Sequence, residues 1–121
     1  MNTTSLIIAV FKPSLRKKFE FNKIHSVTFK ANTITDTLEL SGIGTTTEKY
    51  EPHEKNMNTL KLSDNSEFIS LFLKQIKDKA NFKEVKASEI LLDFINNKAE
   101  TTIYYLNDND IKCKKKIEIE F

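Results

Sequence analysis

Apolar and polar residues alternate most regularly at the C-terminal end of the chain. Through residues 111–121, isoleucine and one cysteine alternate with lysine and glutamate, broken only by Lys115 on the apolar side. A period of two is typical of a strand with one buried face. Residues 101–106 are β-branched and aromatic, and the Asn/Asp run at 107–110 suits a tight turn. We therefore predict a β-hairpin here.

The first half of the chain is also predicted to be strands. A continuous apolar run at residues 5–11, ended by Pro13, is typical of a strand buried on both faces. Further segments alternate or are rich in Phe, Thr and β-branched residues, which favours an antiparallel meander. These segments are residues 17–21, 24–30, 33–40 and the shorter 58–62.

The period then changes to that of a helix. Apolar residues recur every three or four positions over residues 66–79, and Asp64 with Glu67 has the spacing of a capping box. A second, shorter helix is predicted over residues 87–97, where Ile90, Leu91, Phe94 and Ile95 would share one face.

The predicted fold class is α+β. A mostly antiparallel sheet of about seven strands, in the order βββββ-αα-ββ, would carry two helices on one face. The chain has only two Gly and two Pro residues and shows no linker and no evident internal repeat. We therefore expect residues 1–121 to form a single domain.

Composition narrows the function classes. The net charge is only +2, and the 19 basic residues include a single arginine, Arg16, although arginine is the preferred side chain for phosphate and base edges. The single cysteine, Cys113, allows no disulfide within the chain. The apolar run at residues 6–11 is too short for a membrane span. We expect a cytoplasmic protein with no membrane association.

No motif predicts catalysis, a metal or a cofactor. The pair Gly42 and Gly44 lacks the third glycine and the Lys-Ser/Thr of a phosphate loop, and a hairpin corner is the better interpretation. Only His25 and His53 could serve as a base beside a nucleophile. Cys113 lies on the apolar side of the last strand, which is typical of a core thiol. We predict no catalytic residues, no metal and no cofactor.

One long irregular segment, residues 42–57, is the strongest candidate for function. Long loops in small domains are usually functional or disordered. Tyr50 offers a large contact area at low entropic cost, which suits an anchor for a partner. We predict a surface that binds a protein partner, formed by Tyr50, Glu51, His53 and Glu54.

Three function classes follow from these observations. The leading hypothesis is a small non-enzymatic inhibitor, monomeric or a small homo-oligomer, that binds another protein and blocks it sterically, as toxin-immunity and phage anti-defence proteins do. One alternative is a structural subunit of a phage particle or injection system. Another is nucleic-acid binding through two basic clusters. The clusters are Arg16, Lys17 and Lys18, and Lys112, Lys114 and Lys116.

Overall fold

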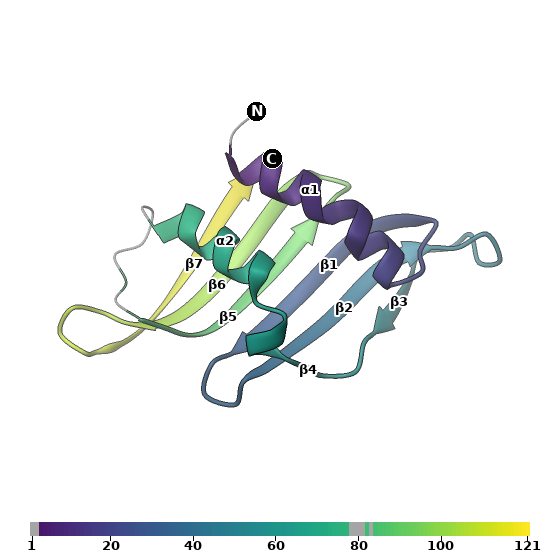
Figure 1. Cartoon of the computed structure of the whole chain (residues 1–121). Coiled ribbons are helices and arrows are strands. Elements are labelled where there is room, and N and C mark those ends of the chain that lie inside the picture. The colour runs from purple at the N-terminus through teal and green to yellow at the C-terminus, as the bar shows by residue number, and fades with distance from the viewer. Residues whose placement is uncertain (1–2, 78–81, 83) are drawn as a thin grey trace.

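The computed structural model describes residues 3–77, 82 and 84–121. Seven antiparallel strands form one open sheet, and two helices lie on one of its faces (Figure 1). This confirms the predicted α+β class. The helices are α1 (Thr3–Lys18) and α2 (Glu67–Ile76), with a short 3-10 helix, η1 (Leu62–Asp64). The strands are β1 (Lys23–Asn32), β2 (Thr37–Thr45), β3 (His53–Asn56), β4 (Leu60–Lys61), β5 (Glu84–Asp93), β6 (Lys98–Leu106) and β7 (Lys112–Glu120).

The strand order in the sheet is β3-β2-β1-β5-β6-β7, and β4 pairs with β2 beyond the end of β3. The two strands at the centre, β1 and β5, are therefore far apart in sequence. They pair antiparallel from Ser26 opposite Asp93 to Asn32 opposite Ala87.

The order of elements differs from the predicted βββββ-αα-ββ, because the first element is a helix. Residues 5–11 belong to α1. Within the apolar run, Ile8 is buried against the sheet whereas Leu6 and Val10 are 51% and 73% exposed. The run looks continuously apolar because the helix also carries apolar residues on its solvent side, so the buried helical stripe cannot be told from the sequence. Pro13 lies within α1 on its exposed side.

The strand predicted over residues 17–21 is also wrong. Here α1 ends, and Glu20 takes a left-handed φ of 57°. This reversal lets both Phe19 and Phe21 turn inward, with their rings stacked at 5.7 Å between centroids. Both side chains are buried. Their spacing of two therefore comes from a turn and not from a strand.

The helix predicted over residues 87–97 is a strand and a turn. Ile90 and Leu92 are fully buried on the inner face of β5, and the turn to β6 follows Asp93. The pairing of β5 with β1 and β6 decided this, since the apolar spacing also fits a helix. Likewise residues 33–36 form a turn, and β2 runs on to Thr45.

The strand predicted over residues 58–62 is confirmed only in part, because β4 covers Leu60–Lys61 and Leu62 begins η1. The remaining predicted elements are confirmed. Residues 24–30 lie in β1, the C-terminal hairpin consists of β6 and β7, and α2 occupies the predicted helix. The predicted end of that helix, residues 78–79, lies outside the described residues. The capping box does not form, because Ser66 stands at the N-cap and its side chain makes no capping hydrogen bond.

The core fills the space between the helices and one face of the sheet. Phe68 of α2 is its aromatic centre, with ring centroids 4.8 Å from Phe29 of β1 and 5.1 Å from Phe11 of α1. Burying a side chain of this size contributes about 2 kcal/mol. The side chains of Ile8, Val27, Phe72, Ile76, Ile90, Leu92 and Ile103 are fully or almost fully buried there.

The two halves of the chain repeat one structural plan, although no repeat is evident in the sequence. β1 and β5 both have 10 residues, and β2 and β6 both have 9. The turns between them have the same length, so each residue from Lys23 to Thr45 has an equivalent between Glu84 and Leu106. At the same spacing, the helix residues Ile8, Phe11 and Leu15, which are buried or partly buried, correspond to the buried Ile69, Phe72 and Ile76.

The equivalence extends to the details of the backbone. Register shifts at His25 in β1 and at Lys86 in β5 are equivalent bulges. The turn after β1 is held by Asn32, whose Oδ1 accepts backbone N–H groups at 2.9 and 3.1 Å, and Asp93 Oδ1 does the same after β5 at 2.9 and 3.1 Å. Asp36 and Asn97 take the left-handed φ in these turns, at 52° and 53°.

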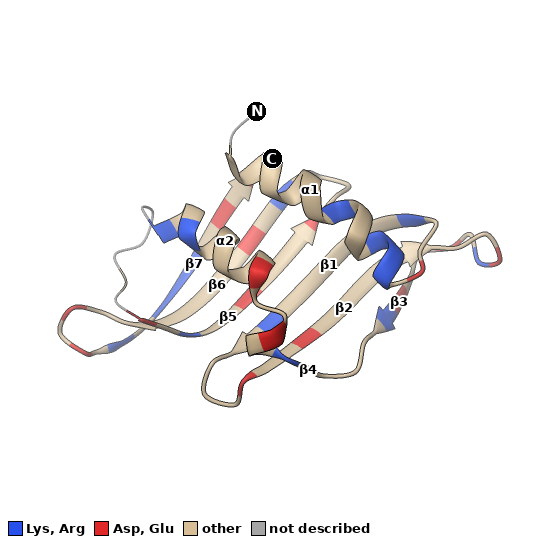
Figure 2. Cartoon of the chain, in the orientation of Figure 1, with Lys and Arg blue, Asp and Glu red and all other residues tan. Residues whose placement is uncertain are grey.

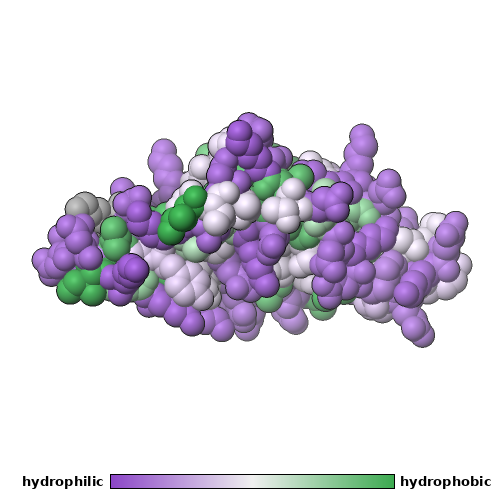
Figure 3. Space-filling model, turned by 90° about the horizontal axis from the view of Figure 1, so that it is seen from below, coloured by the Kyte–Doolittle hydropathy of each residue, from purple (hydrophilic) through white to green (hydrophobic). Residues whose placement is uncertain are grey.

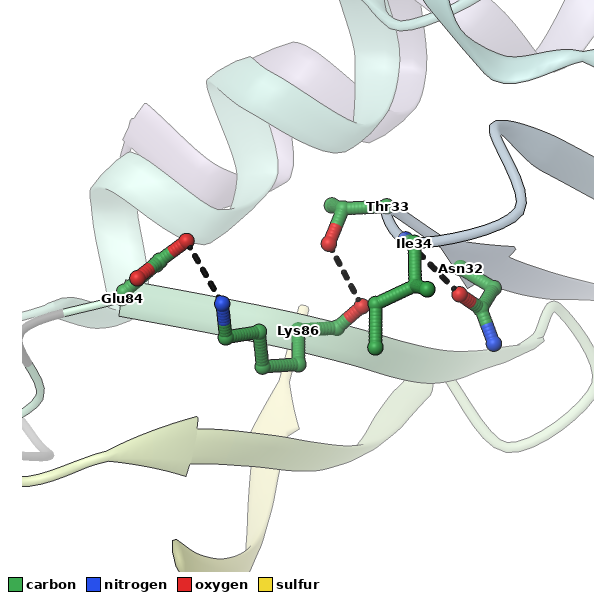
Figure 4. A network of polar contacts seen from close by, with 5 residues as sticks. All are labelled: Asn32, Thr33, Ile34, Glu84 and Lys86. Atoms are coloured by element: carbon green, nitrogen blue, oxygen red, sulfur yellow. Dashed lines mark hydrogen bonds and ion pairs between the residues drawn. The ribbon is translucent and has the colours of Figure 1, made fainter. Parts of the chain in front are cut away.

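Each of these turns also donates a backbone hydrogen bond to the bulge residue of the other half. The N–H of Thr33 donates to the Lys86 carbonyl oxygen at 2.9 Å, and the N–H of Phe94 donates to the His25 carbonyl oxygen at 2.8 Å. Figure 4 shows the first of these turns, with Thr33 and Ile34 next to Lys86. The two halves are thus related by a pseudo-twofold arrangement about the β1–β5 pair.

The two glycines are needed for close approach and not for a hairpin corner. Both lie inside β2, and neither has a positive φ. A Cβ on Gly44 would lie 2.5 Å from the Lys23 carbonyl oxygen and 2.6 Å from the Phe21 ring. At Gly42 the nearest atoms would be those of the Phe19 ring at 3.2 Å.

We expect Gly44→Ala to lower the free energy of unfolding by about 2 kcal/mol, because backbone must move to admit the methyl group. Gly42→Ala is the matched control in the same strand. It should cost less than about 1 kcal/mol, since only a side-chain ring must shift. Urea denaturation of the two variants checks this, and equal losses would contradict it.

Candidate functional site

The face of the sheet opposite the helices is the largest surface without a covering layer in the described part of the chain. Both α1 and α2 lie on the other side (Figure 1). Outward positions on β1, β2, β5 and β6 carry mostly threonine, serine and charged residues of both signs. They include Thr28, Lys30, Glu39, Ser41, Glu89, Glu100 and Thr102.

Apolar side chains interrupt this polar face, and two of them, Ile43 and Tyr104, lie at equivalent places. Leu91 of β5 also points outward but is half-buried. Ile43 of β2 is 39% exposed and Tyr104 of β6 is 41% exposed. The exposed isoleucines at the hairpin tips, Ile34 and Ile95, are equivalent to each other as well. Figure 3 shows separate hydrophobic patches within a mainly hydrophilic surface on the side seen from below.

Each of two hollows contains one residue from each of these pairs. The Tyr104 hollow, about 430 Å³ in volume, is lined by Tyr104, Leu106, Ile34, Lys86, Lys112 and Lys114, among others. The Ile43 hollow has the same volume, about 430 Å³, and is lined by Ile43, Leu91, Ile95, His25 and Asp93, among others. In both hollows a tip isoleucine, a bulge residue and an outward residue of β2 or β6 occupy equivalent positions.

Half of the segment at residues 42–57, which the sequence predicts to be irregular, belongs to the sheet. Residues 42–45 complete β2, residues 53–56 form β3, and only residues 46–52 connect them. Tyr50 lies in this connection and is 83% exposed, beside the exposed Glu51. These two residues remain available to a partner.

The other two predicted contact residues point to opposite faces. His53 packs edge-on against Phe21 at 5.7 Å on the helix side, and its Nδ1 lies 3.1 Å from the Glu51 carbonyl oxygen. Glu54 pairs with Ile43 across β3 and β2 and faces the uncovered side. It lines a shallow polar hollow there with Lys30. The four residues therefore do not form one surface.

The structure also separates the two basic clusters. Arg16, Lys17 and Lys18 end helix α1, whereas Lys112, Lys114 and Lys116 lie on β7. α1 lies on the covered side of the sheet, whereas β7 forms one edge of the sheet. Figure 2 shows the blue end of α1 and the blue part of β7 at different sides of the molecule. Lys116 is also paired with Glu100 at 3.9 Å.

The other residues considered for catalysis, His25 and Cys113, lie within strands of the sheet. His25 is the bulge residue of β1, and the Cys113 thiol, which is not bonded to another cysteine, donates to the Ile111 carbonyl oxygen at 3.4 Å. Within residues 3–77, 82 and 84–121, no group of three His, Cys, Asp or Glu side chains is arranged to hold a metal ion. Neither helix, as far as it is described, is long and apolar enough to cross a membrane.

Comparison with known proteins adds no identification. No protein-family model, no curated protein and no solved structure matches this chain.

Sequence reasoning missed the residues of the two hollows. The sequence pattern predicts Ile43 in a hairpin corner between two glycines and Ile95 in a helix. The available signal was the recurrence of Asn32 and Asp93, each followed two positions later by isoleucine. Asn and Asp side chains at this place hydrogen-bond the backbone of a turn, so the recurrence indicates two similar turns.

Asp93 at the edge of the Ile43 hollow has a lowered pKa. The main cause is the hydrogen bond from the Asn96 side-chain amide at 2.8 Å, helped by the backbone N–H groups of Asn96 and Ile95 and by the charge of Lys98, and opposed by burial. A carboxylate that accepts several hydrogen bonds stays ionised to lower pH. Lys98 in turn has a raised pKa, chiefly because it donates to Glu118.

We expect Asp93→Ala to lower the free energy of unfolding at neutral pH by about 1 kcal/mol, because the turn loses its acceptor. Asp93→Asn should retain most of the stability, since Asn32 fills this role in the equivalent turn. The folded-state pKa of Asp93 lies below the ordinary value of 3.8. The carboxylate's contribution is therefore present above about pH 4 and is lost as pH falls through the folded-state pKa.

The difference in unfolding free energy between the wild type and Asp93→Asn should therefore shrink in acid. Urea denaturation at pH values from roughly 7 down to 2.5 measures it. A difference that is constant with pH would contradict the role of the carboxylate.

Proposed function

We propose that this protein binds another protein through the uncovered face of its sheet and inhibits that partner by steric occlusion. The observation that carries the proposal is the placement of Ile43 and Tyr104. Both are about two-fifths exposed, at 39% and 41%, on a face that is otherwise mostly polar. Apolar anchors within a polar surround are the usual anatomy of a protein interface.

The charges on this face also favour a protein partner. Glu39, Glu89 and Glu100 point outward from the central strands, and basic side chains lie among them and along β7. Acidic groups on the face would repel a phosphate backbone, whereas charges of both signs suit the mixed surface of a protein.

Tyr50 offers a further exposed contact residue next to the β3 edge of the sheet. Among the residues that the structure describes, it is the most exposed large apolar side chain, at 83%, and it lies in the connection between β2 and β3. Tyrosine gives a large contact area with few rotatable bonds. The strands around the face are held by hydrogen bonds to their neighbours, so binding would order little of the chain beyond this loop.

The proposal is tested with a partner captured from the native host and then purified. We expect the double variant Ile43→Ser/Tyr104→Ser to raise Kd by at least about 30-fold, equivalent to about 2 kcal/mol, because it removes both anchors. A separate Tyr50→Ala variant measures the contribution of the loop. Isothermal titration gives Kd for each protein.

Leu71→Ser is the matched control. Leu71 lies on α2 and is 39% exposed, the same fraction as Ile43, but on the covered side of the sheet. Its Kd should stay within about threefold of the wild type, and urea denaturation confirms that every variant is folded. If the double variant bound as tightly as the control, the uncovered face would not be the interface.

A further inference from the structure

The two equivalent hollows share a backbone plan but differ in charge. Beside Ile43 the paired residue on the neighbouring strand is Glu54, and beside Tyr104 it is Lys114. Asp93 lines the Ile43 hollow, whereas three lysines and no acidic residue line the Tyr104 hollow. The same geometry is thus acidic in the first half and basic in the second.

The lysines of the Tyr104 hollow are differently placed. Lys86 forms an ion pair with Glu84 at 2.9 Å, as Figure 4 shows. Lys112 and Lys114 are exposed on β7, and Lys114 Nζ lies 5.7 Å from the centre of the Tyr104 ring. Asp108 and Asp110 belong to the adjoining turn and do not line the hollow. The hollow therefore combines an apolar wall with cationic groups at its rim.

Apolar side chains make up most of the wall of the Tyr104 hollow. Ile34, 77% exposed, approaches from the β1–β2 turn and faces Tyr104, Tyr105 and Leu106 of β6. An aromatic or aliphatic side chain would remove this surface from water, and carboxylates beside it would meet the lysine ammonium groups. A purely apolar ligand would make no use of the exposed ammonium groups of Lys112 and Lys114, and a polyanion would make no use of the apolar wall.

We propose that the Tyr104 hollow is a binding site for an acidic peptide segment that carries one aromatic or aliphatic anchor. The proposal rests on the proposed function, because such a segment would belong to the protein partner. It adds the chemistry of the partner's contact: an apolar side chain flanked by Asp or Glu. The Ile43 hollow, with its acidic surroundings, does not bind this segment.

The test uses three synthetic peptides and the whole chain labelled with ¹⁵N. The acidic peptide is Asp-Glu-Phe-Glu-Asp, the second replaces Phe by Ala, and the third is Lys-Lys-Phe-Lys-Lys. Peptide is added to about 2 mM, which detects sites with Kd near 1 mM. The acidic Phe peptide should shift the amides of Ile34, Tyr104 and Lys114. The other two peptides should bind at least about tenfold more weakly, since each lacks one of the two interactions.

Equivalent positions provide the control variants. Lys114→Glu should weaken the acidic Phe peptide at least about tenfold, and Lys112→Glu, also exposed, should act in the same direction. Glu54→Lys changes charge at the equivalent place in the first half and should leave the affinity of the Tyr104 hollow within about twofold. The ¹⁵N spectrum of each variant shows whether it remains folded.

Three results would overturn the inference: no shifts from the acidic Phe peptide, shifts centred on Ile43 and Ile95, or equal affinity in Lys114→Glu and the wild type. These results leave the proposed function intact if Ile43→Ser/Tyr104→Ser still weakens binding of the purified partner. Conversely, a partner insensitive to that double variant would refute the proposed function, and the peptide titration would still decide whether the hollow binds acidic segments.

Discussion

The antiparallel pairing of β1 with β5 is the interaction on which the rest of the structure depends. It joins strands that are distant in sequence, from Ser26 opposite Asp93 to Asn32 opposite Ala87. Each half would otherwise be a small sheet with one helix, too small to bury a core of its own. Pairing brings both helices to the same face, where Phe29 of β1 stacks on Phe68 of α2. The core thus belongs to both halves together.

The same pairing makes the two halves support each other at their turns. Thr33 in the first turn bonds to the bulge at Lys86, and Phe94 in the second bonds to the bulge at His25. A bulge frees a carbonyl from the regular ladder, and the turn of the other half uses it. The hollows arise at these junctions, because each tip isoleucine lies over the strand of the other half. The candidate site is therefore a consequence of the central strand pair and could not exist in one half.

The two halves of the chain share a backbone plan but differ in their outward side chains, and these two facts have different consequences. Most buried positions are apolar in both halves, since helix and sheet must exclude water in the same way. Ser88 and Thr101 are exceptions: both are buried, where the first half has Val27 and Leu40. The outward positions are free to differ, and Glu54 and Lys114 differ in sign at equivalent places. A surface that repeats in shape but not in charge can distinguish the parts of a partner. The inference about the Tyr104 hollow depends on this difference.

The sequence by itself determined the α+β class, helix α2 and the C-terminal hairpin. In these segments the period of apolar residues was unambiguous, as in the alternation that buries Ile117 and Ile119. It also marked Tyr50 as an exposed residue suited to a contact. Where apolar residues fitted two periods, local pattern was insufficient, and residues 5–11 and 87–97 were each assigned the wrong element.

Only the tertiary structure decided those segments, because burial against the sheet selects one face of α1 and strand pairing selects β5 over a helix. It also decided the site. Ile34 and Tyr104 come from different hairpins and line one hollow only after β1 and β5 pair. The spacing of residues along the sequence does not predict this contact, because the contact depends on a strand pair formed between distant residues.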